Sequence, residues 1–339
     1  MTGLVDRWSD VVGRSRALWL LDIHLRGAGQ VMLQNNPLTG LLFILGICWG
    51  AIAAGNLALA IGGVVGLIVA TLTAILLEAD ETALDQGLFG FNGILVGVAI
   101  PTFLAMSPAT WFILIIGAAV STIVMLATSH VMKVWGVPAL TFPFVLTAWL
   151  VVLAAYSFGH LSIRGLAPPS LPTPIGETAA SLDLSAGFFL TASIKGISQV
   201  FLINNIITGA MFILALLVSS GWAAGFAILG SIVSVAVALA LGSSPAAIDA
   251  GLYSFSPVLT AIALGCVFFK PSSRVALFAL LGTVFAVIVQ AAFDAALAPL
   301  GVPTFTIAFV LVTWLFLLPK LDLKPHRHEP LEDGIVTDR

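Results

Sequence analysis

The segment QVMLQNNPLTG, from Gln30 to Gly40, returns as QVFLINNIITG from Gln199 to Gly209, with seven of the eleven positions identical. Two further blocks recur in the same order. They are DQGLFGFNGIL at 85–95 with DAGLYSFSPVL at 249–259, and VPALTFPFVLTAWL at 137–150 with VPTFTIAFVLVTWL at 302–315. Such a duplication in a membrane protein is typical of two halves related by pseudo-symmetry, with the functional site at their junction.

Composition assigns the chain to a membrane. The chain is 60% hydrophobic and 9% charged, with a mean hydropathy of +1.13, values far from those of soluble domains. Apolar stretches of about 18–22 residues recur, each long enough to cross the hydrocarbon core as a helix. Cys48 and Cys266 both lie in such stretches, so we expect no disulfide, metal centre or other cofactor. The net charge of −3 gives no reason to expect a nucleic acid partner.

Each half contains six hydrophobic segments, which predicts an all-α polytopic fold. An Asn-Asn pair interrupts the first segment of each half. Either that segment or the glycine-rich one that begins at Asp85 or Asp249 is expected to enter the membrane and return, because broken backbone needs cover by protein or water. The expected count per half is five full spans plus one re-entrant half-helix. The segments lie near 17–35, 38–56, 58–78, 85–104, 109–134 and 139–157, and near 187–205, 206–220, 223–242, 249–268, 274–297 and 304–320.

An odd number of crossings per half inverts the second half relative to the first, with the pore between them. The distribution of Lys and Arg supports this arrangement. With the N-terminus in the cytoplasm, eleven of these residues fall inside, and only Arg164 and Lys195 fall outside. The predicted organisation is a cytoplasmic N-terminal segment (1–26), a first transmembrane repeat (27–157), an external Pro/Gly-rich linker (158–186), a second repeat (187–320) and a cytoplasmic tail (321–339).

The repeated blocks supply amides, hydroxyls and rings, but few charges. Rings and apolar branches beside a line of oxygens suit a flat, neutral solute with several N–H groups. An ion would instead need a charged ring or a cage of carbonyls. The matched pairs are Gln30 with Gln199, Thr141 with Thr306, Phe91 with Phe255, and Leu95 with Leu259 one helical turn further on.

The NNP-x-x-G block at 35–40, followed by GLFGFNGILVG at 87–97, resembles the urea transporter family. The resemblance covers about residues 20 to 320, and the degenerate second copy is similar to the second half of that family. It implies ten spanning helices and two re-entrant helices in inverted halves. It also implies a homotrimer with one pore per protomer and passive, channel-like passage of urea.

The same resemblance implies roles for individual residues. Phe91 and Phe255 would form slot-like constrictions, with Leu95 and Leu259 beside them. Gln30 and Gln199 would form hydrogen bonds with urea. Thr141 and Thr306 would face the narrow centre, and Val200 would line the wall.

The chain departs from the family pattern in several places. Ser256 and Pro257 replace an amide and a small residue, Leu33 and Leu202 stand where an aromatic can occur, and Gln199 stands where some members have glutamate.

Each of these residues also has a purely structural interpretation. A glutamine in a membrane helix can bridge two helices, a threonine can bond its own helix backbone, and the phenylalanines can be ordinary packing. The Asn-Asn pairs and the two aspartates before the glycine-rich segments are expected to cap helices. The remaining structural candidates are Asp294, as a paired group or one that faces water, and Trp149 and Trp314, as packing or interfacial residues.

Other functions fit the sequence less well. An ammonium channel would be expected to carry pore histidines, and none of the five histidines is repeated. An enzyme needs a nucleophile with a base or a metal cluster, and no such pattern is present in the sequence. The prediction is a urea channel in a bacterial inner (plasma) membrane, with both ends in the cytoplasm. The alternatives are a channel for a short amide or ammonia, and an ion-coupled transporter that uses Asp85, Asp249 or Asp294.

Overall fold

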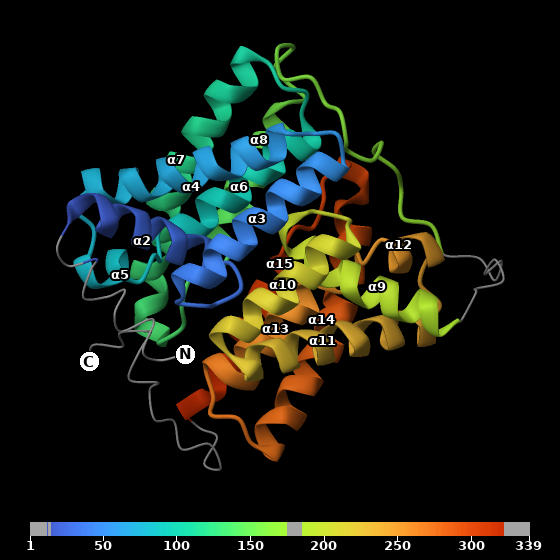
Figure 1. The fold of residues 1–339 in the computed structure, drawn as a ribbon. Helices are drawn as coiled ribbons and strands as arrows, with labels where there is room; N and C mark the ends of the chain where they lie inside the picture. The colour runs from blue at the N-terminus through green and yellow to red at the C-terminus, as the bar shows by residue number, and fades with distance from the viewer. Residues whose placement is uncertain (1–11, 13–14, 175–184, 322–339) are drawn as a thin grey trace.

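The computed structural model describes residues 12, 15–174 and 185–321 of the 339-residue chain (Figure 1). Much of the predicted N-terminal segment, part of the linker and nearly all of the predicted tail therefore lie outside the described residues. Most of the described part is helical, and its only β-type pairing is an isolated bridge between Leu104 and Ile163. The predicted all-α class is confirmed.

The two halves repeat each other helix for helix. Within the described residues, seven α-helices of the first half are followed by seven of the second, long and short ones in the same order. The first-half helices are α2 (Arg16–Gln30), α3 (Pro37–Ala53), α4 (Ala58–Leu76), α5 (Glu81–Asp85), α6 (Gly90–Phe103), α7 (Pro108–Met132) and α8 (Phe142–Ala154). Their counterparts are α9 (Ala186–Ser198), α10 (Ile206–Ser219), α11 (Gly221–Ala240), α12 (Pro245–Asp249), α13 (Phe255–Ile262), α14 (Ser273–Leu297) and α15 (Ile307–Leu317).

The Asn-Asn pairs break the chain between α2 and α3 and between α9 and α10. The side chain of Asn36 accepts from the backbone N–H groups at the start of α3, and that of Asn205 accepts from Thr208 N at 3.0 Å. Side-chain oxygens at this position satisfy donors that the helix itself leaves unpaired. The prediction that the Asn-Asn pairs cap helices is confirmed for the second asparagine of each pair, while the Asn35 side chain accepts from Arg26 Nη1 at 2.7 Å instead. In the second half the helices on the two sides of the break differ in direction by 75°.

In the part of the chain that the structure describes, four helices are long and apolar enough to cross a membrane: Ala58–Leu76, Pro108–Trp135, Gly221–Ala240 and Ser273–Leu300. Residues on their outer faces are exposed leucines, isoleucines and phenylalanines, among them Phe112 and Leu281, as expected of a surface that meets lipid. The other apolar helices are shorter than a full span, so the count of ten spans stays a prediction. The protein is an all-α polytopic membrane protein.

Hydrogen bonds between the halves come in reciprocal pairs. The Thr39 hydroxyl donates to Ala215 O at 2.8 Å, and the Thr208 hydroxyl donates to Gly46 O at 3.0 Å. Thr39 and Thr208 are equivalent in the repeat, as are Gly46 and Ala215. A contact that recurs with the partners exchanged is the signature of a two-fold relation. The bonds join α3 to α10, so the broken segments of the two halves pack against each other (Figure 1).

The two repeated tryptophans make a second reciprocal pair. Trp149 Nε1 donates to Pro303 O at 2.9 Å, and Trp314 Nε1 donates to Pro138 O at 2.8 Å. Both indoles are partly buried and pack against the core. They therefore act as packing residues that tie α8 and α15 to the opposite half.

Glycines allow α6 to lie directly against α4. A Cβ added to Gly93 would stand 2.3 Å from the Ala70 Cβ, and one added to Gly97 would stand 2.0 Å from Gly62 O. No side chain fits at such distances, so the two backbones touch. The glycine-rich block therefore lets the two helices approach each other closely.

The prediction that Asp85 and Asp249 cap the following spans is wrong. Each is the last residue of a short helix, α5 or α12, and α6 and α13 begin only after a further glycine turn. Asp85 accepts from Trp19 Nε1 at 2.7 Å, and Asp249 pairs with Lys195 Nζ at 3.0 Å. The two carboxylates hold α2 against α5 and α9 against α12, which is a structural role.

Candidate functional site

The centre of the junction is a pair of threonine hydroxyls. Thr141 Oγ1 and Thr306 Oγ1 lie 2.7 Å apart and are hydrogen-bonded across the two halves. Both side chains are about 2% exposed. Neither hydroxyl bonds the backbone of the helix that it precedes, α8 or α15, so the interpretation that these threonines satisfy themselves locally is wrong. The structure brings together two predicted site residues that are 165 positions apart.

Each threonine of the pair directly follows a residue with an unusual backbone conformation. The residues just before the threonines, Leu140 and Phe305, have φ angles of 53° and 48°. Leu and Phe rarely adopt positive φ, because Cβ then crowds the backbone. Local strain of this kind persists where the surrounding packing requires it, and it clusters at functional sites. Here the conformation turns the chain sharply into α8 and α15.

The predicted slot residues begin α6 and α13. Phe91 and Phe255 lie in the first turn of these helices, and each is 6% exposed. Leu95 and Leu259 follow one turn later and are fully buried. Val200 is also buried, in the short 3₁₀ turn that follows α9.

The two glutamines are anchored in the same way. Gln30 Nε2 donates to Gln86 O at 2.9 Å, and Gln199 Nε2 donates to Ala250 O at 2.7 Å. Both side chains are 7% exposed. Among the described residues no donor bonds either side-chain oxygen. Each amide is therefore held by its nitrogen, which leaves its carbonyl oxygen available as an acceptor.

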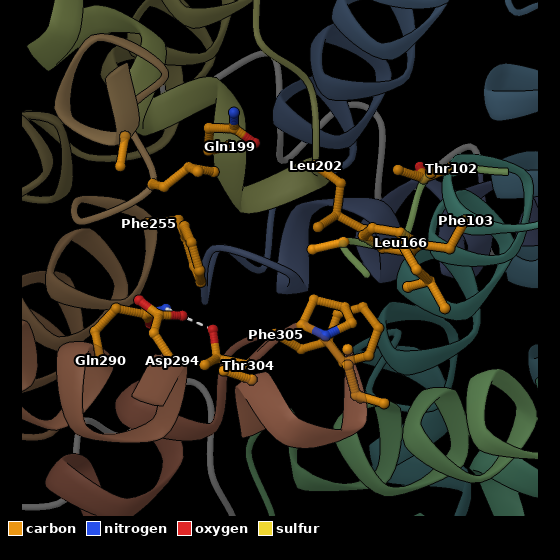
Figure 2. A pocket seen from close by; sticks show the side chains of 18 of the residues that line it. Thr102, Phe103, Leu166, Gln199, Leu202, Phe255, Gln290, Asp294, Thr304 and Phe305 are labelled. Carbon is orange, nitrogen blue, oxygen red and sulfur yellow. Dashed lines mark hydrogen bonds between the residues drawn. The ribbon is translucent and has the colours of Figure 1, made fainter. Parts of the chain in front are cut away.

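A cavity of about 550 Å³ lies beside the linker and is lined mostly by residues of the second half. Gln199 and Phe255 both line it, together with Phe305 and linker residues between 165 and 170 (Figure 2). Phe305 directly precedes Thr306, so the cavity reaches to within one residue of the threonine pair. The other predicted site residues are not among its lining residues.

Sequence reasoning missed two polar side chains in this cavity, Gln290 and Thr304. Gln290 Nε2 donates to Thr304 Oγ1 and, at 3.3 Å, to Asp294 Oδ1, while its own oxygen accepts from Ser256 at 3.2 Å. Gln290 is 1% exposed. The first half has no such cluster, because Met125 stands at the position equivalent to Gln290 and Ala139 at that of Thr304. A glutamine within an apolar membrane helix was the signal that could have found it.

The site is poor in groups for metal or covalent chemistry. Within the described ranges, no three His, Cys, Asp or Glu side chains are grouped so that they could hold a metal ion. The arrangement offers hydroxyls, amide oxygens, aromatic rings and one carboxylate, which together can bind a solute through hydrogen bonds.

The sequence of this chain is similar to those of known proteins over most of its length. A family model described as "Urea transporter" matches residues 21–321. Urea transporter 1 of Ovis aries is 32% identical over 310 residues, which cover 90% of this chain and 78% of the relative. Urea transporter 1 of Rattus norvegicus is 31% identical over 308 residues, which cover 89% of this chain and 77% of the relative.

Proposed function

Because this chain belongs to the urea transporter family, we propose that it carries urea passively through a narrow route between its two halves. The route runs from the cavity beside the linker, past Phe255, to the Thr141–Thr306 pair, and leaves past Phe91. The observation that carries the proposal is the hydroxyl pair, since it places neutral hydrogen-bonding groups where the halves meet.

Urea is flat and neutral, and it loses strong hydration when it enters a narrow route. Two hydroxyls that bond each other still keep a free O–H and unused lone pairs, so they can accept from urea N–H groups and donate to its carbonyl. The oxygens of Gln30 and Gln199 would accept further N–H groups on the two sides of the centre. Phe91 with Leu95, and Phe255 with Leu259, would hold the plane of the solute, and Val200 would line the wall.

Passive transport needs no ion site, and the basic side chains near the two glutamines, Arg26 and Lys195, are paired with carboxylates. Lys195 bonds Asp249, and Arg26 bonds Asp22 at 2.6 Å. Among the described residues that line the cavity, Asp294 is the one with a charged side chain. It is therefore the residue on which an ion-coupled mechanism, the second candidate, would depend.

Stopped-flow measurements on purified protein in liposomes test the proposal. We expect urea to equilibrate faster than in empty liposomes, and a proton or sodium gradient to leave its flux unchanged. Water, glycerol and ammonia serve as comparison solutes. Urea flux equal to that of empty liposomes would refute the function, and concentrative uptake driven by either gradient would support the ion-coupled alternative.

The two rings give a prediction about selectivity. We expect Phe91→Ala and Phe255→Ala to admit bulkier amides such as dimethylurea, because each removes a wall that restricts solute width. The measurement is the ratio of dimethylurea flux to urea flux. Phe112→Ala, which removes a lipid-facing ring that is 65% exposed, is the matched control. An unchanged ratio in both folded variants would make the rings packing residues.

We further propose that the protein resides in a bacterial inner (plasma) membrane as a homotrimer, with inverted halves and both termini in the cytoplasm. The excess of Lys and Arg on the predicted inner side supports the orientation. The trimer, with one route per protomer, rests on the family resemblance.

A further inference from the structure

The cavity beside the linker contains one group that a route for a neutral solute does not require. Among the described residues that line it, Asp294 is the one charged at neutral pH. Asp294 is an exposed residue at the wall of the cavity, and the remaining lining residues are mostly apolar. A carboxylate beside apolar walls is less well solvated than one in open water, so it favours a cation as a partner.

Asp294 is held in place from one side. Gln290 donates to it, and Gln290 is itself fixed by bonds to Ser256 and Thr304. An ionised carboxylate has about four acceptor positions on its two oxygens. The bonds from Gln290 and from the Thr304 hydroxyl occupy two of them, so acceptor positions remain for a ligand in the cavity.

Aromatic rings line the same cavity as the carboxylate. In Figure 2 the ring of Phe255 lies between Gln199 and Asp294, and Phe305 lies beyond Thr304. The face of an aromatic ring attracts a cation. The amide oxygen of Gln199 adds an acceptor at the opposite side of the same cavity.

We propose that this cavity binds planar guanidinium-type monocations, with Asp294 as their counter-ion. A guanidinium group presents parallel N–H donors that match a carboxylate, and its flat faces can stack on rings. A bare sodium or potassium ion would need a shell of several oxygens, and the cavity offers few. The guanidinium ion also has the flat, three-armed shape of urea.

A bound cation of this kind would occupy the entrance without passing. The centre of the junction is buried and holds only neutral hydroxyls, so a charge that entered it would lose its hydration without a counter-ion. The first half has Ser129 and Met125 where the second has Asp294 and Gln290. The site is therefore one-sided. This part of the inference rests on the proposed function.

Binding is tested with methylguanidinium by saturation-transfer NMR on the purified full chain, because the methyl protons report weak binding directly. We expect saturable binding that weakens at least about tenfold in Asp294→Asn, since a charge-assisted pair is lost. Asp294→Glu keeps the carboxylate and should bind within a few-fold of the parent. Glu81→Gln removes the same charge from an exposed position on α5 and should bind like the parent. Parental binding by folded Asp294→Asn, or no saturable binding by the parent, overturns the proposal.

Inhibition is tested separately, in oriented proteoliposomes with methylguanidinium on one side. We expect urea flux to fall when the cation is on the linker side and to stay unchanged when it is on the other side. If methylguanidinium binds through Asp294 but leaves urea flux unchanged at saturation, the cavity is not on the urea route and the blocking role is wrong. The NMR result does not depend on urea transport, so the two failures are distinguishable.

Discussion

Thr141→Val and Thr306→Val are each expected to slow urea flux about tenfold. Valine has nearly the shape of threonine, so the walls of the route keep their form while the hydroxyl is lost. An unmade hydrogen bond in a buried place costs about 1–3 kcal/mol, and about 1.4 kcal/mol is a factor of ten in rate. The measurement is stopped-flow urea flux per amount of folded protein in liposomes.

A matched control separates this effect from general damage. Thr283 is also about 2% exposed, but its hydroxyl donates to Ala279 O of its own helix at 2.7 Å. Thr283→Val therefore removes a buried threonine hydroxyl that lies outside the pair, and we expect near-parental flux. If the Thr141 and Thr306 variants also carry urea at the parental rate, the hydroxyl pair only joins the halves and the proposed route is wrong.

The duplication made much of the site predictable. The same residue type at both equivalent positions indicates a role in both halves. This criterion selects the threonines, glutamines and slot phenylalanines without knowledge of the fold. The structure places Thr141 and Thr306 in contact and anchors Gln30 and Gln199 to equivalent backbone carbonyls, Gln86 and Ala250. Whether these residues line a pore stays a prediction.

The same method could not find residues that only one half carries. Gln290 and Thr304 have Met125 and Ala139 as counterparts, so a comparison of the repeats passes over them. Their importance comes from the cavity that they line, and that cavity is formed partly by the linker, which has no repeat. Asymmetry between the halves becomes visible only when the chain is folded.

Short elements were the other source of error. Asp85 and Asp249 were expected to cap spans because a five-residue helix is too short to show a periodicity in sequence. The structure ends α5 and α12 at these aspartates. The cross-half bonds of Trp149 and Trp314 were equally invisible, since their acceptors are backbone carbonyls more than 150 residues away. Backbone acceptors have no signature in sequence.

The second large effect on urea flux is predicted for substitutions of the paired glutamines. We expect Gln30→Leu and Gln199→Leu each to slow urea flux several-fold while leaving oligomer assembly intact. Leucine removes the free side-chain oxygen that would accept a urea N–H on one side of the centre. It also removes the donor to Gln86 O or Ala250 O, a bond worth about 1 kcal/mol in stability. Flux must therefore be compared at equal amounts of folded protein, with assembly checked by size-exclusion chromatography.

Glutamate at the same positions separates the two functions of each amide. Gln30→Glu and Gln199→Glu keep acceptor oxygens but lose the Nε2 donor that anchors the side chain. If the oxygen serves urea, the glutamate variants should transport faster than the leucine variants, although both lose the anchor. If the anchor alone matters, both substitutions should slow flux equally. Parental flux in well-assembled leucine variants would mean that the glutamines only tie α2 and η2 (Gln199–Phe201) to the neighbouring turns, and the acceptors for urea would then have to be sought elsewhere along the junction.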